Sequence, residues 1–286
     1  MNRRRFLSLT AMAALLPGVA RAEVGWTGVA LGADCEVTLT GDPVQAEPAL
    51  SALPRLLDAI EADFSLYRAD SAVNRLNAHG RLDAPSPAFC ALMQLSDRVH
   101  LLTGGAFDPT VQSLWRALAA GSDGSAAPMG RHRVQTQPPS LPPGMALTFN
   151  GIAQGFATEA ARALFESHGF TRALIQIGEA AALGGPFRLA LQDPDHGQLG
   201  TVSLTDMAIA TSSRFATRVN GHPHILHPRG LPPLWSTVSV RATSAALADA
   251  LSTALVFLPR ARIAALDIPE VQAVTLVDLQ GNLSTL

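Results

Sequence analysis

The chain contains no lysine: all 21 basic residues among its 286 are arginines. It therefore cannot form a lysine Schiff base with a substrate, and it lacks the lysine of a Walker-type phosphate loop. Only 15% of the residues are charged and the net charge is −2, so no basic stripe is available to neutralise a phosphate backbone. We expect no nucleic-acid partner.

Cysteine is also scarce. Cys35 and Cys90 are the two cysteines of the chain. In an oxidising compartment they could form one disulfide, and otherwise they would remain two separate thiols. Their spacing in the sequence does not decide between these alternatives, because a disulfide depends on distance in space.

Long apolar runs are absent as well, and the run at 6–16 is too short to span a bilayer stably. It follows three arginines and precedes a small-residue cleavage pattern. Residues 1–22 are therefore predicted to be a twin-arginine export signal that is cleaved after Ala22, which would place the protein in the periplasm. The alternative is an N-terminal helix that anchors the protein in a membrane.

With 48% hydrophobic residues, the chain can bury a core as one large domain or as two interlocked halves. Strand and helix patterns are mixed without a regular βαβ rhythm. We therefore predict an α+β fold for residues 23–286, with a largely antiparallel sheet and packed helices in two interlocked halves. Segment 121–144 is rich in Gly, Ser and Pro, and we expect a surface loop or hinge there that marks a soft internal boundary.

Local signals predict the elements around the candidate site. Strand patterns cover 28–41, 237–242 and 271–278. The pattern of 146–178 predicts a strand, a glycine turn, a helix and a second strand. Predicted helices are 49–64, which Pro54 interrupts or starts, 72–77 after a Ser71 cap, 87–102 after a Ser86 cap, 109–119 after an Asp108 cap, and 244–258.

The last of these helices carries a polar pair, Asp249 and Thr253, which are four residues apart and share one face. Small residues surround the pair, so another element or an ion could approach closely. Carboxylate and hydroxyl oxygens suit Mg²⁺. In the alternative interpretation, Asp249 is exposed and Thr253 bonds back to the carbonyl one turn earlier.

Two further stretches contain groups that bind anions or protons. The stretch 222–230, HPHILHPRG, has three histidines in a proline-rich loop, where an imidazole could act as a general acid or base. The stretch 210–215, ATSSRF, offers hydroxyls and an arginine that could contact an anion, but a plain turn after a strand is the favoured interpretation. There is no G-x-S-x-G motif, so a serine hydrolase is poorly supported.

The order of several blocks along the chain is more specific than any one of them. FSLYRADSAVNRLN, LTGGAFDPTVQSLW, FNGIAQGFATEAARALFESHGF, IATSSRF, HILHPRG and ADALSTAL together resemble the ApbE family, the FAD:protein FMN transferases, from about residue 25 to the C-terminus. The resemblance implies that FAD is the substrate and Mg²⁺ the cofactor. FMN would be transferred through a phosphoester bond to a threonine or serine of an acceptor flavoprotein, typically a membrane-associated electron-transfer protein, with release of AMP.

The resemblance also implies roles for nine residues, each matched by its block. The residues implied in FAD binding are Tyr67, Ala106, Phe107, Asp108, Gln154 and His224, and those implied in Mg²⁺ binding are Asp249, Thr253 and the carbonyl of Gly151. His224 is in addition the candidate general base for the acceptor hydroxyl.

Three positions depart from the family pattern. Gln154 stands where the family has lysine, Gly178-Glu179-Ala180 replaces its GGD, and His227 replaces the Asp of its HxxDP. Arg214 or Arg229 could supply the missing positive charge. These departures keep two alternatives open: a periplasmic protein that binds FAD without transferring FMN, and a Mg²⁺-dependent FAD pyrophosphatase.

Overall fold

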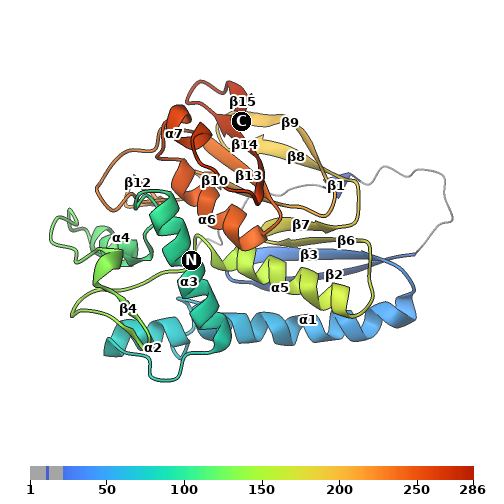
Figure 1. Ribbon diagram of the computed structural model, residues 1–286, viewed down its shortest axis with the longest axis horizontal. Helices are drawn as coiled ribbons and strands as arrows, with labels where there is room; N and C mark the ends of the chain where they lie inside the picture. The colour runs from blue at the N-terminus through green and yellow to red at the C-terminus, as the bar shows by residue number, and fades with distance from the viewer. Residues whose placement is uncertain (1–10, 13–21) are drawn as a thin grey trace.

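The computed structural model describes residues 11–12 and 22–286 of the chain (Figure 1). Most of the export signal predicted for residues 1–22 lies outside these residues and stays a prediction. Within the described part, none of the helices combines the length and the apolar character needed to cross a bilayer.

One eight-stranded sheet forms the centre of the fold, in the order β15-β14-β13-β10-β7-β6-β3-β2, and every neighbouring pair is antiparallel. Its strands are β2 (Glu23–Ala30), β3 (Ala33–Thr40), β6 (Ala173–Ile177), β7 (Glu179–Leu183), β10 (Ala208–Ser213), β13 (Thr237–Ala242), β14 (Val271–Val277) and β15 (Leu283–Thr285). The predicted α+β class with a large antiparallel sheet is confirmed. Strands from both ends of the described chain complete the same sheet.

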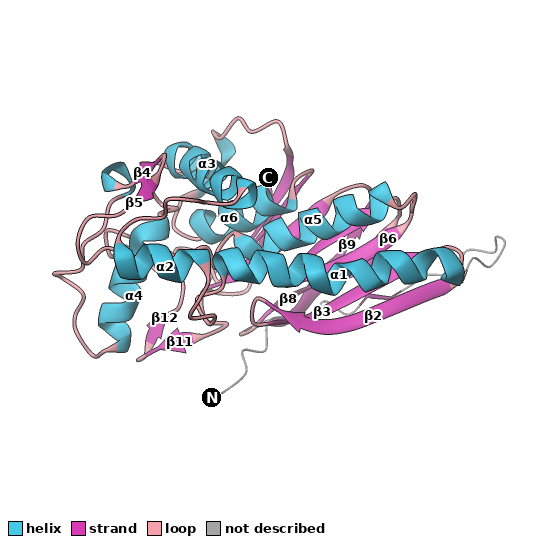
Figure 2. Ribbon diagram, turned by 90° about the horizontal axis from the view of Figure 1, so that it is seen from below, coloured by secondary structure: helices cyan, strands magenta, loops and turns pink. Residues whose placement is uncertain are grey.

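Helices cover one face of this sheet (Figure 2). They are α1 (Pro43–Phe64), α5 (Ala153–Ser167) and α6 (Ala245–Leu255). Against the other face packs a hairpin of β8 (Phe187–Asp193) and β9 (Gly197–Leu204), and β1 (Ala11–Met12) pairs with β8. The other elements are α2 (Ala72–His79), α3 (Pro87–Leu102), η1 (Pro109–Val111), α4 (Gln112–Ala119), η2 (Arg131–Arg133), β4 (Gln135–Thr136), β5 (Pro139–Ser140), β11 (Arg218–Val219), β12 (His222–Pro223) and α7 (Arg260–Ala264).

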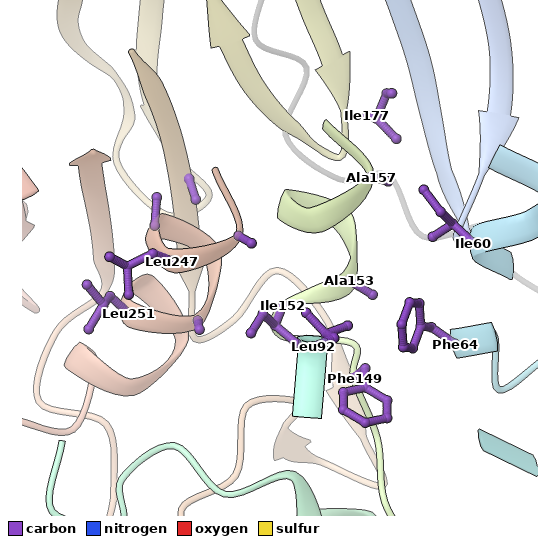
Figure 3. Packing of buried hydrophobic residues seen from close by; sticks show 14 of the residues in the cluster. Ile60, Phe64, Leu92, Phe149, Ile152, Ala153, Ala157, Ile177, Leu247 and Leu251 are labelled. Carbon is purple, nitrogen blue, oxygen red and sulfur yellow. The ribbon is translucent and has the colours of Figure 1, made fainter. Parts of the chain in front are cut away.

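The main core lies between the sheet and the helices, and it also fixes the start of α5 (Figure 3). Phe64 at the end of α1 meets Phe149 with ring centroids 5.3 Å apart. Phe149 and Ile152 are fully buried on either side of residues 150–151. Because both anchors are buried, the short turn between them, which includes Gly151, is held in place.

The predicted helix caps are confirmed. Ser71 accepts from Asn74 N at the start of α2, which ends at Gly80 with a left-handed φ of 71°. Ser86 caps α3 in the same way, and Asp108 accepts from Thr110 N ahead of η1, which leads directly into α4. Short-range hydrogen bonds of this kind involve residues close in sequence, so sequence reveals them.

Two strand predictions are wrong. Segment 28–41 is not one strand, because the chain reverses at Leu31 and Gly32, where φ is +50° and +78°, and forms the β2–β3 hairpin. Segment 146–149 joins no sheet. Its N–H groups donate instead to Ser113 Oγ, to Asn77 Oδ1 and to the Pro109 carbonyl.

Pro54 neither interrupts nor starts a helix, because α1 continues through it from Pro43. An internal proline costs a helix about 3 kcal/mol. The α1 face that contains Leu53, Leu57 and Ile60 is buried, and this packing outweighs the missing hydrogen bond.

Cys35 and Cys90 are both free thiols, Cys35 within the core. Burial raises the pKa of the Cys35 thiol to about 11. Segment 121–144 contains η2 and the short β4–β5 pair, and the buried Arg131 of this segment forms an ion pair with the half-buried Asp97 of α3.

Candidate functional site

A cavity of about 400 Å³ collects the residues implied by the sequence blocks. Its wall is built by the start of α5, by α6, α4, β7 and β10, and by the loops after α1, α3 and β12. All nine implied site residues line it: Tyr67, Ala106, Phe107, Asp108, Gly151, Gln154, His224, Asp249 and Thr253. The fold thus brings separate segments to one site, while the individual roles of these residues stay predictions.

Two carboxyl groups lie at the buried end of the cavity. Asp249 on α6 is only 3% exposed, and one of its oxygens accepts from Gly155 N at 2.9 Å. Burial raises the pKa of Asp249 to about 7. Glu179 on β7 accepts from Thr211 N at 3.0 Å, and burial together with the charge of Asp249 raises its pKa well above the usual value.

This arrangement excludes the interpretation in which Asp249 faces solvent. Thr253 does not bond back along its own helix within the described structure, because its hydroxyl pairs with Ser212 Oγ at 3.3 Å. Glycines permit the close approach of α5 to α6. A Cβ at Gly151 would lie 2.9 Å from Thr253 Oγ1, and one at Gly155 would collide with the Ala245 carbonyl and lie 2.7 Å from Asp249 Cβ.

The donor set at this end fits a hard cation such as Mg²⁺. Gly151, Asp249 and Thr253 would contribute carbonyl, carboxylate and hydroxyl oxygen, and Glu179 adds a second charge nearby. Among the described residues there is no group of three or more His, Cys, Asp or Glu side chains that could hold a metal ion. A site with so few side-chain ligands suits Mg²⁺, which keeps several waters.

The loop 103–108 forms another part of the wall. Gly104 and Gly105 both have a left-handed φ, and the turn they make is held by Thr103 Oγ1, which accepts from Phe107 N at 3.1 Å. His100 Nδ1 lies 2.8 Å from the Phe107 carbonyl. The loop is thus rigidly attached to the end of α3.

Asp108 also stabilises this loop. Its carboxylate accepts from Thr110 N, from the Thr110 hydroxyl and from Arg131 N. With these donors in place, the carboxylate orients the backbone of residues 106–108 along the cavity wall.

Tyr67 lies at the rim and is 68% exposed. Asn74 Nδ2 donates to the carbonyls of Ser65, Leu66 and Arg68 and so holds the loop that carries the ring. Gly32, in the β2–β3 turn, would bring a Cβ within 3.6 Å of the Tyr67 ring. An aromatic face at a cavity mouth suits stacking with a flat ring system.

His224 is held by Thr217, whose carbonyl lies 3.1 Å from His224 N and 3.0 Å from Nδ1. Because a carbonyl only accepts, Nδ1 carries the hydrogen in this bond. Nε2 is then the ring nitrogen that can take up a proton.

The departures from the family pattern occupy different places. Gln154 lines the cavity, and its Nε2 donates to the Leu31 carbonyl at 3.3 Å. His227 does not line it, since its ring packs edge-on against Phe257 with centroids 5.0 Å apart, and burial followed by the charge of Arg229 lowers its pKa.

The expectation that Arg214 or Arg229 supplies a cation to the cavity is not met, because neither lines it. The Arg214 guanidinium instead lies 3.9 Å from the centroid of the Phe215 ring. Arg116 lines the cavity, and sequence reasoning missed it. The sequence did contain a signal for Arg116. It lies four residues after Gln112 on the helix that follows the Asp108 cap, so the two side chains share one face of that helix.

Comparison with known proteins gives consistent matches. The model of the ApbE family matches residues 31–275. A curated relative named FAD:protein FMN transferase, from Klebsiella pneumoniae (strain 342), is 26% identical over 275 residues and covers 81% of this chain and 77% of its own. A relative of the same name, from Vibrio cholerae serotype O1 (strain ATCC 39541 / Classical Ogawa 395 / O395), is 25% identical over 244 residues, 73% of each chain.

Solved structures share the fold. The flavin transferase ApbE from Vibrio cholerae has a TM-score of 0.79 at 21% identity and covers 93% of this chain and 97% of its own. The apo flavinyl transferase ApbE of Pseudomonas stutzeri also has a TM-score of 0.79, at 24% identity, with 93% and 94% covered.

Proposed function

Because the chain belongs to the ApbE family, we propose that it transfers FMN from FAD to a threonine or serine hydroxyl of an acceptor protein and releases AMP. The observation that carries the proposal is the convergence of all nine implied site residues on one cavity. That cavity combines an aromatic rim, which suits a flat ring, with a buried pair of carboxyl groups, which could hold the cation that a pyrophosphate needs.

The proposed reaction is a single exchange at phosphorus. The acceptor oxygen forms a bond to the FMN phosphorus, the bond from that phosphorus to the bridging oxygen breaks, and AMP leaves with the bridging oxygen. The acceptor hydroxyl loses its proton, and His224 Nε2 is the group that we propose takes it. The Thr217 carbonyl orients the imidazole for this task.

Mg²⁺ is part of the same proposal. Asp249, Thr253 and the Gly151 carbonyl would hold it, with Glu179 close by. Bound there, it would neutralise charge on the phosphate oxygens as they react. The chain's own contribution is positional, because the Gly155 N–H orients the Asp249 carboxylate and Ser212 orients the Thr253 hydroxyl.

We propose that the acceptor is met outside the cytoplasm, because residues 1–22 are typical of an export signal. The mass of the protein recovered from the exported fraction tests this. It should correspond to a chain that begins at Glu23.

The transfer itself is tested with the full chain, FAD, Mg²⁺ and an acceptor domain that carries one flavinylatable threonine. We expect AMP release that depends on the acceptor, and a fluorescent acceptor band that disappears when the acceptor threonine is changed to valine. AMP release without acceptor would indicate a pyrophosphatase. Bound FAD without AMP release would favour the flavin-binding alternative, which the neutral Gln154 supports.

The variant His224→Gln separates binding from transfer. Since general base catalysis contributes about 10²- to 10⁴-fold, we expect transfer to slow by about a hundredfold or more. Because His224 is also implied in FAD binding and lines the cavity, the rates are compared at saturating FAD, where a change in affinity does not contribute. Unchanged transfer would exclude His224 as the base.

A further inference from the structure

The charges on the cavity wall do not favour an anionic substrate. Three carboxyl groups line the cavity, those of Asp108, Glu179 and Asp249. Among the described residues that line it, Arg116 is the one arginine, and the chain has no lysine. A pyrophosphate that enters this cavity needs a cationic partner, because its negative charges would otherwise lie close to carboxylates.

Three other arginines near the site already have partners. The guanidinium of Arg131 binds Asp97 and the Val134 carbonyl. Those of Arg214 and Arg218 lie over the Phe215 ring, at 3.9 Å and 4.2 Å from its centroid. None of the three lines the cavity.

Gln154, where a lysine would stand in the family pattern, supplies no charge. Its amide donates to the Leu31 carbonyl, and it is nearly buried. A Cβ at Gly178 would lie 2.6 Å from Gln154 Oε1, so the side chain is also closely confined. This part of the wall is therefore neutral and occupied.

Arg116 has the opposite properties. Gln112, Trp115 and Arg116 lie at i, i+3 and i+4 of α4, and all three line the cavity, so one face of this helix is directed to it. Arg116 is exposed, and within the described structure its guanidinium has no hydrogen bond or ion pair. Its five N–H donors are thus available to a ligand.

We propose that Arg116 binds the pyrophosphate of the dinucleotide substrate and supplies the positive charge that Gln154 does not. This inference rests on the proposed function. A guanidinium can bind phosphate oxygens in a bidentate manner, and Arg116 lines the cavity that would hold the substrate. In this proposal the substrate is bound by Arg116 on α4, whereas Gln154 lies on α5.

Equilibrium binding tests this without turnover. The full chain is titrated in EDTA with FAD and, separately, with riboflavin, which has the same ring system and no phosphate, and flavin fluorescence is followed. Arg116→Gln should weaken FAD binding about tenfold, the effect of losing hydrogen bonds to a charged group, and should leave riboflavin binding unchanged. Arg116→Lys should retain part of the affinity for FAD, because it keeps the positive charge but loses the bidentate geometry.

Arg133→Gln is the matched control, because Arg133 is also an exposed arginine but does not line the cavity. It should bind both ligands as the unmodified protein does. Added salt should weaken FAD binding less steeply in Arg116→Gln than in this control. Equal weakening of FAD and riboflavin binding in Arg116→Gln would overturn the inference, since it would indicate a structural role.

The inference and the proposed function fail in different ways. If the unmodified protein binds FAD and Arg116→Gln binds it equally well, only the inference is overturned. If the unmodified protein binds neither FAD nor riboflavin, in EDTA or with Mg²⁺ present, the proposed function is overturned and the inference with it.

Discussion

Two regions of the molecule bury carboxyl groups in opposite ways. In the cavity, Glu179 and Asp249 each accept one backbone N–H within the described structure. At the junction of β8 with β13, Asp193 is equally buried but accepts four hydrogen bonds. Its donors are the hydroxyls of Ser236 and Thr237 and the N–H groups of Asp195 and His196.

The pKa shifts reflect this difference. Burial, and for Glu179 also the charge of Asp249, raises the pKa of the cavity pair. Burial would raise the pKa of Asp193 as well, but the bonds from Thr237, Ser236 and the two N–H groups outweigh it and lower the value. A carboxylate with all its donors serves the fold, whereas a pair with few donors is suited to a ligand from outside.

The variant expected to have the largest effect in this comparison is Asp249→Asn. We expect turnover to fall by about a thousandfold, because the carboxylate that we propose holds the cation, an interaction worth several kcal/mol, is lost. Thermal stability in EDTA should not fall, since the asparagine oxygen can still accept from Gly155 N and a charge beside Glu179 is removed. AMP release and a thermal unfolding curve check both parts, and retained turnover would exclude Asp249 as a cation ligand.

Gly155→Ala should affect stability and activity together. The new Cβ would collide with the Ala245 carbonyl and force α5 away from α6, at a cost of about 2 kcal/mol in the free energy of unfolding. Turnover should fall because Asp249 moves with α6. Gly200→Ala is the control, because nothing lies within 4 Å of its Cβ position, so its free energy of unfolding should not change. Urea unfolding measures both variants, and an equal loss of stability in the two would contradict the prediction.

Asp193→Asn should give the reverse of Asp249→Asn. Replacing a carboxylate that accepts four bonds should lower the free energy of unfolding by about 1.5 kcal/mol and leave AMP release close to normal. Urea unfolding at neutral pH and the transfer assay provide the two measurements. A loss of activity without a loss of stability would contradict the contrast drawn between the two regions.

The smallest effect is a dependence on pH. Because the folded-state pKa of Asp193 is below its ordinary 3.8, the stability from its carboxylate is complete above about pH 4 and is lost as the pH falls through the lowered value. The difference in unfolding free energy between the unmodified protein and Asp193→Asn should therefore shrink below about pH 4. A difference that persists unchanged at pH 2 would mean that the carboxylate charge is not its source.

Sequence patterns predicted elements whose signals are local. Ser71 and Ser86 cap helices through bonds to N–H groups three residues away, so the sequence contains both partners. The β2–β3 turn was missed because Leu31 is an unusual residue for a positive φ and has none of the Asn-Gly character of common hairpin turns. Segment 146–149 was missed because its partners, such as Asn77, are distant in the chain.

The sequence by itself determined the α+β class, most helix ends and the blocks that contain the nine implied site residues. Only the tertiary structure decided that Glu179 lies beside Asp249, that His227 packs in the core, and that Arg116 rather than Arg214 lines the cavity. The reason is the range of the forces involved. Caps and turns depend on neighbours in sequence, whereas burial and charge at a cavity depend on which distant segments the packed sheet and helices bring together.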